Sequence, residues 1–160
     1  MENIEVVIQK IKNAFSRGVP NGLLLGWQQN RHYDDIVHIA KPYRVTNDTD
    51  FNYSFCNSYN VDFNCDSSNY VYVITLKISF IADVYSIHVT RYTRDKKKGR
   101  LIHVFPDAGL SILMQTVHGC MQDKGFVVLK NESLDLELDD LELELAEVAT
   151  IGKCLFDDFE

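Results

Sequence analysis

Long apolar runs, a secretion signal and paired cysteines are all missing from this sequence of 160 residues. No apolar stretch approaches the roughly 20 residues that a membrane-spanning helix needs. The first five residues lack the basic start and apolar core of a signal peptide, so we expect a cytoplasmic protein with no membrane partner. No C-x-x-C pair is present, and we expect free, mostly buried thiols at the four cysteines: Cys56, Cys65, Cys120 and Cys154.

Catalytic and metal-binding motifs are also absent. His32 and His38 flank Asp34 and Asp35, but no H-x-E or H-E-x-x-H spacing supports a metal site. The glycines of the 18–26 stretch are not followed by Lys-Ser or Lys-Thr, which excludes a phosphate-binding loop. His118 and Cys120 are two residues apart on an expected helix, so they point to different faces and do not form a nucleophile pair. We therefore predict a non-enzymatic domain without metal or cofactor.

Basic residues are scarce at one end of the chain. Residues 131–160 contain eleven acids and one base, Lys153, whereas residues 1–130 contain twelve acids and fifteen bases. The net charge of −7 is thus concentrated in the last thirty residues. Such a surface disfavours nucleic acid and anionic membrane and favours a basic partner. A basic cluster between Arg91 and Arg100 is interpreted as the solvated tip of a hairpin.

The apolar pattern that is present predicts one α+β domain over residues 1–160, with a largely antiparallel sheet. Tyr70 to Ile81 has two largely apolar faces, which is typical of a central strand. Short connections join it to the next two strands, so we expect an antiparallel meander. The predicted strands lie near residues 70–81, 84–92, 101–105, 126–130 and 134–138, and the predicted helices near 3–16, 108–123 and 141–156.

Local signals support the helix ends and leave other segments open. Asn3 and Asp107 can cap the first two helices, and Gly125 can end the second. Residues 46–69 are rich in Asn, Asp and Ser but contain five aromatic residues, which predicts an ordered loop with a short strand around Tyr53. The apolar runs 23–27 and 36–40 are too short to assign by period.

Leucines alternate with acids after residue 133, and their spacing fits both strand and heptad patterns. We favour a strand at 134–138 that forms a hairpin with 126–130, followed by a helix from Leu141 capped by Asp140. Eight acids lie between Glu132 and Glu147, here called the acidic segment. Packing of the leucines would hold these charges on an ordered surface, at a cost in repulsion that a basic partner would relieve.

The acidic segment and an aromatic anchor are therefore the predicted partner-binding site. Its residues are Glu137, Asp139, Asp140, Glu142, Glu144 and Trp27. Aromatic residues of the 51–63 stretch are further candidates for exposed anchors. The alternative is a small enzyme or small-molecule-binding domain with a pocket around His88 and His103, and a third reading is an oligomerisation domain.

A small acidic α+β domain with the C-terminal sequence Lys153-Cys-Leu-Phe-Asp-Asp158 resembles the immunity proteins of bacterial polymorphic toxin systems. The likeness covers the general profile and the acidic C-terminal third. Those proteins bind and neutralise a cognate toxin, often a basic nuclease, and need no cofactor. The resemblance implies an inhibitor that acts through its acidic surface.

Overall fold

The computed structural model describes residues 3–64, 69–95 and 97–159, and its centre is an open antiparallel sheet. The five strands follow one another in chain order: β1 (Arg44–Asn47), β2 (Cys56–Asn64), β3 (Tyr70–Ser79), β4 (Tyr85–Thr93) and β5 (Gly99–Ile102). The predicted meander and the central position of residues 70–81 are confirmed. The third predicted strand, 101–105, begins and ends earlier, as β5.

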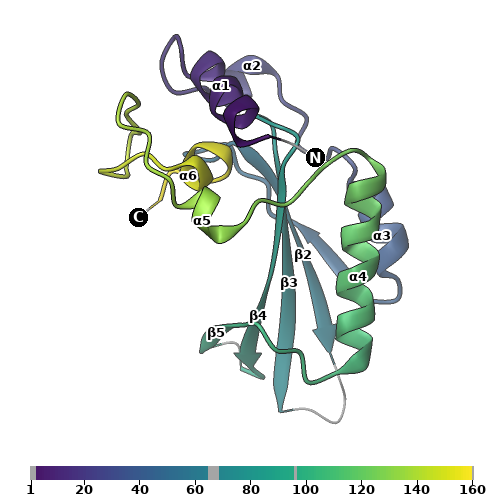
Figure 1. Cartoon of the computed structure of the whole chain (residues 1–160). Helices are drawn as coiled ribbons and strands as arrows, with labels where there is room; N and C mark the ends of the chain where they lie inside the picture. The colour runs from purple at the N-terminus through teal and green to yellow at the C-terminus, as the bar shows by residue number, and fades with distance from the viewer. Residues whose placement is uncertain (1–2, 65–68, 96, 160) are drawn as a thin grey trace.

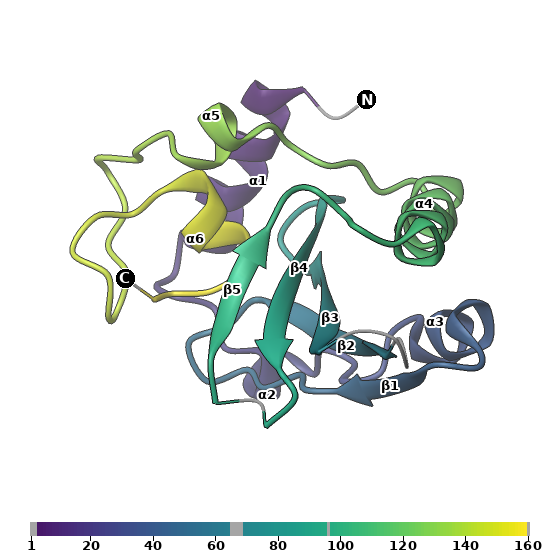
Figure 2. The same ribbon diagram turned by 90° about the horizontal axis from the view of Figure 1, so that it is seen from below.

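Two helices cover one face of this sheet, and Figure 2 shows them side by side. They are α3 (Tyr33–Ala40) and α4 (Ala108–Asp123). The face beneath them is apolar because alternate residues of each strand point the same way. It is formed mainly by Tyr59, Val61, Phe63, Ile74, Leu76, Ile78, Tyr85 and Val89, all buried.

A second apolar cluster lies at one end of the sheet. There α1 (Ile4–Ala14), α5 (Asn131–Leu134) and α6 (Ile151–Leu155) lie together, in the upper part of Figure 1, and the short helix α2 (Gly22–Leu25) follows α1 in the chain. Val7, Ile11, Phe55, Ile151 and Leu155 are buried in this cluster. It connects the N-terminal helix to the C-terminal segment, and Leu138 anchors the acidic segment in it.

The capping predictions are confirmed at three helix ends. The Asn3 side chain accepts a hydrogen bond from the Glu5 N–H, and that of Asp107 accepts from Gly109 and Leu110. Gly125 follows α4 with a φ of +90°, a left-handed conformation that glycine adopts without strain. The helix predicted at 108–123 is α4, and the one predicted at 3–16 is α1.

Three predicted elements are wrong. Residues 126–130 form a single parallel bridge, Val127 with Val84, and no hairpin with 134–138. Residues 131–134 form α5, and Glu137 makes an antiparallel bridge with Thr150. The expected helix at 141–156, with Asp140 as its cap, is reduced to α6, because the backbone before it has other hydrogen-bond partners, described below.

The loop predicted at 46–69 contains the end of β1 and all of β2, and its residues 65–68 lie outside the described residues. β2 occupies residues 56–64, and Tyr53 has a φ of +58°, so no strand forms around it. The unassigned runs 23–27 and 36–40 overlap the helices α2 and α3.

Candidate partner-binding surface

The acidic segment is an irregular but packed chain between α5 and α6. Its leucines differ in environment: Leu138 is buried, Leu141 and Leu143 pack against the second apolar cluster, and Leu136 and Leu145 are exposed. All five predicted binding acids, Glu137, Asp139, Asp140, Glu142 and Glu144, are exposed. The inward leucines therefore keep the carboxylates at the surface in a defined order.

Asp158 fixes the C-terminal end of this segment. Its carboxylate is fully buried and accepts hydrogen bonds from the N–H groups of Glu144 (2.7 Å), Leu145 (3.0 Å) and Ala146 (2.8 Å). These three donors would be used by i−4 carbonyls in a helix, so Asp158 takes the place of helical bonding. The Asp158 N–H in turn donates to the Tyr53 carbonyl at 2.7 Å, which ties the C-terminal segment to the turn before β2.

The flanks of the segment are closed by backbone pairing. The Leu138 N–H donates to the Ala149 carbonyl at 2.8 Å, and the Ile151 N–H donates to the Leu136 carbonyl at 3.0 Å. Residues 136–138 thus run antiparallel to 149–151 and form the base of a long loop. The loop projects away from the sheet at the left of Figure 1.

Few cations neutralise these acids within the described part of the chain. Lys12 on α1 lies 3.4 Å from Asp140, and among the described residues this is the one ion pair of the five predicted acids. Both side chains are largely exposed, so this pair contributes little stability. The remaining carboxylates present an uncompensated negative field to solvent.

Trp27 differs from the expected exposed anchor. It is partly buried, stacks on Phe80 at 4.8 Å between ring centroids, and meets Phe51 edge-on at 5.7 Å. Of the 51–63 aromatics, Phe51, Phe55, Tyr59 and Phe63 are buried, whereas Tyr53 is 42% exposed. These rings mainly stabilise the fold, and Tyr53 is the one among them that a partner could contact broadly.

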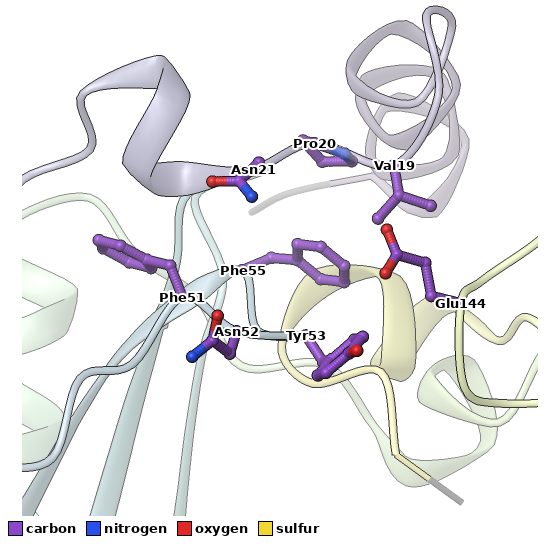
Figure 3. Close-up of a pocket in the computed structure, with 8 residues that line it drawn as sticks. All are labelled: Val19, Pro20, Asn21, Phe51, Asn52, Tyr53, Phe55 and Glu144. Atoms are coloured by element: carbon purple, nitrogen blue, oxygen red, sulfur yellow. The ribbon is translucent and has the colours of Figure 1, made fainter.

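A hollow of about 250 Å³ links this aromatic region to the acidic segment, and Figure 3 shows its lining. Tyr53 and Phe55 form its floor, and the chain from Val19 to Asn21 lies opposite them. The Glu144 carboxylate points toward Val19 across this space. The acidic surface is therefore continuous with the turn that precedes α2.

At the alternative site, the β4–β5 ladder ends at the pair Val89–Ile102, and His88 and His103 are the next residues beyond that pair. On the other side of β4, His88 is opposite Thr75, and His103 is exposed. Burial lowers the pKa of His88, Lys77 lowers it further, and Asp157 opposes the shift. The adjacent hollow is lined by Lys77, which is ion-paired with Asp157, and by Ser54 and Ser58, but by neither histidine.

The thiols and the other titratable candidates have structural contacts. Burial raises the pKa values of Cys56 and Cys154 to about 12, so both thiols stay protonated and unreactive at neutral pH. Cys120 is partly buried, Cys65 lies outside the described residues, and the three described cysteines are free. His118 shares a 2.8 Å hydrogen bond with the Tyr85 hydroxyl.

Asp35 pairs with Lys124 at 2.8 Å, and this contact, together with the charge of Lys124, lowers the pKa of the carboxyl. Over the described ranges, no three His, Cys, Asp or Glu residues are grouped so that they could hold a metal ion. No helix there combines the length and apolar character needed to cross a bilayer.

Two features of this surface were missed by sequence reasoning. Asp158 looked like one more acid of the tail, and nothing in its local sequence marks it as buried. The exposure of Leu23, Leu24 and Leu25 on α2 was equally hidden, although the flanking Asn21 and Gly26 are signals of a short capped helix.

Comparison with known proteins gives no relative: no protein-family model matches the chain, and no curated protein or solved structure does. The functional interpretation rests on the geometry above.

Proposed function

We propose that this protein is a non-enzymatic binding domain, of the immunity type, that neutralises a basic protein such as a toxin nuclease by docking its acidic segment on it. The observation that carries this proposal is the fixed, outward display of carboxylates. A buried carboxylate and packed leucines hold the segment, while its own acids stay exposed and largely without cations. Charge held in this way repels itself, and a basic partner would relieve the repulsion and be steered to the surface.

The proposal is tested first by capture. The immobilised protein and its Glu142→Lys/Glu144→Lys variant are exposed in parallel to lysate of the source cells, with Asp123→Lys on α4 as a charge-reversal control outside the acidic segment. We expect the wild type and the control to retain a basic protein that the double variant loses. The captured protein is then expressed alone and with this chain, and co-expression should restore growth that the captured protein inhibits.

The kinetics of the purified pair give the second test. Exposed charges are screened beyond about 10 Å at 0.1 M salt, so the association rate should fall steeply between low and physiological salt. The double variant should lose most of that salt dependence and change the dissociation rate less. Recovery of acidic partners alone, or an affinity that the double reversal leaves unchanged, would show that the segment is a solvated face.

A further inference from the structure

The short helix α2 presents three leucines to solvent. Leu23, Leu24 and Leu25 are 62%, 86% and 61% exposed, and together they are called the leucine ridge. Single exposed leucines are ordinary on protein surfaces, whereas contiguous apolar patches mark interaction sites.

This ridge is held in place at both ends. The Asn21 side chain accepts hydrogen bonds from the Leu23 and Leu24 N–H groups, and Gly26 closes the helix with a φ of +71°. Gly22 lies so close to the rings of Trp27 and Phe51 that a Cβ there would be 2.6 and 2.7 Å from their atoms. The face of α2 that carries Gly22 thus packs on the Trp27 and Phe51 rings, and the leucines on its other side are exposed in a defined conformation.

The ridge borders a hollow that leads to the acidic segment. Leu24 and Leu25 line a space of about 340 Å³ together with Ala14, Val19 and Pro20. Val19 also lines the neighbouring hollow, which is bounded by residues 140–144. Across the third hollow, in Figure 3, the side chain of Glu144 is directed at Val19. An apolar centre and an acidic border therefore share Gly18 and Val19.

We propose that the leucine ridge and the acidic segment form one docking surface for a basic protein segment that carries an apolar side chain beside its cations. This inference rests on the proposed function and specifies the partner. Interfaces commonly have an apolar centre that supplies most of the affinity and a charged rim that supplies encounter and orientation. The charge of the rim selects the occupant: acids at residues 140–144 repel anionic lipid and a second acidic copy of this end of the molecule, and they attract lysine and arginine.

The test uses two synthetic helical peptides without tryptophan. The first has a stripe of leucines flanked by lysines, and the second has the same lysines with glutamine in place of leucine. Trp27 is the one tryptophan of the chain and packs against the base of α2, so its emission reports binding at the ridge. The proteins are the wild type, Leu24→Ser/Leu25→Ser, Glu142→Lys/Glu144→Lys, and the control Ile112→Ser, which changes a 64% exposed side chain on α4. Circular dichroism verifies that each variant is folded.

We expect the leucine peptide to bind the wild type at least tenfold more tightly than the glutamine peptide. The leucine-ridge variant should lose about tenfold in affinity for the leucine peptide alone, the charge variant should lose affinity for both peptides, and Ile112→Ser should bind as the wild type does. Equal binding of the two peptides, with an unaffected ridge variant and a weakened charge variant, overturns this inference and leaves the proposed function standing.

Peptide binding that the charge variant leaves intact overturns the proposed function instead. The last experiment uses phosphatidylcholine vesicles. If the vesicles change the Trp27 emission and displace the bound peptide, the ridge binds lipid, and the proposed docking surface for a protein is overturned.

Discussion

Asp158 shows how a single buried charge shapes a whole surface. An ionised carboxylate without water is strongly unfavourable unless hydrogen bonds replace its hydration. Three backbone N–H groups from residues 144–146 supply them, at 2.7–3.0 Å. Asp158 is one of many acids near the end of the sequence, yet it is buried and stabilises the fold from inside.

Replacing Asp158 by alanine should therefore leave three donors without a partner and destabilise the fold by about 2–4 kcal/mol, with Asp158→Asn, which keeps an acceptor oxygen, less affected. Urea denaturation measures the difference. The matched control is Asp139→Asn, an exposed acid of the same segment, which should change stability by less than about 0.5 kcal/mol. Equal losses in the Asp158→Ala and control variants would contradict the structural role.

Histidine burial predicts a pH dependence. Burial lowers the pKa values of His32, His88 and His118 below the unfolded value of about 6.5. The unfolded chain then binds protons first as pH falls, so the stabilisation is complete above pH 6.5 and is lost as the pH decreases through the folded pKa values. The urea midpoint of the wild type should decrease from pH 7.5 to pH 5.5, and the midpoint of His88→Gln should decrease by a smaller amount. A midpoint that rises on acidification in both proteins would falsify this assignment.

At the level of the element, α2 depends on the glycine that joins it to the aromatic cluster. Gly22→Ala should cost about 1–3 kcal/mol, because its Cβ would overlap the rings of Trp27 and Phe51. Gly119→Ala, inside α4, meets no atom within 4 Å and should stabilise the protein by about 0.5–1 kcal/mol through helix propensity. The midpoint of thermal unfolding should fall for Gly22→Ala and rise for Gly119→Ala. Midpoints that both rise or both fall would contradict the packing at Gly22.

The elements that sequence reasoning identified correctly are those with strong local signals. β3, β4 and α4 have long periodic patterns, and caps mark the helix starts at Asn3 and Asp107. β2 was missed because its polar side chains, Ser58, Asn60 and Asp62, were interpreted as turn formers. They alternate with Tyr59, Val61 and Phe63, which is the pattern of an antiparallel strand with one covered face.

The helix expected at 141–156 failed for a non-local reason. Its residues favour helix, but Asp158 takes the N–H groups that the helix would use, and leucine packing draws the chain into the second apolar cluster. The exposure of the five acids followed from their residue type, whereas the role of Trp27 required knowledge of Phe51 and Phe80. Tertiary contacts of this kind leave no periodic signal in the sequence.

Over the whole molecule, charge is separated along the fold. The acidic segment lies beside α1 and α6, whereas Arg91, Arg94, Lys97, Lys98 and Arg100 lie on β4, β5 and their connection, at the other end of the sheet in Figure 1. Arg91 lies over the Tyr70 ring at 4.4 Å, so part of this basic group also packs on the sheet. The separation gives the molecule an electric dipole, and such a dipole would orient a charged partner before contact.

Crowded carboxylates should also affect the free protein. Raising salt from about 0.01 to 0.15 M shortens the Debye length from about 30 to 8 Å and should stabilise the wild type by weakening repulsion. Glu142→Lys/Glu144→Lys should be more stable than the wild type at low salt and should gain less from added salt. Urea denaturation at the two ionic strengths measures both effects, and a double variant that is less stable at low salt would count against repulsion in the segment.

The clamp by Asp158 also sets an order of events during synthesis. A ribosome releases residues 144–146 before residue 158, so the loop emerges without the carboxylate that later organises it. The sheet strands and α4 precede both, and they can assemble while the acidic loop is still unfixed. The face proposed for partner capture is thus ordered only after the rest of the domain has been synthesised, and a nascent chain would present it with the domain behind it already in place.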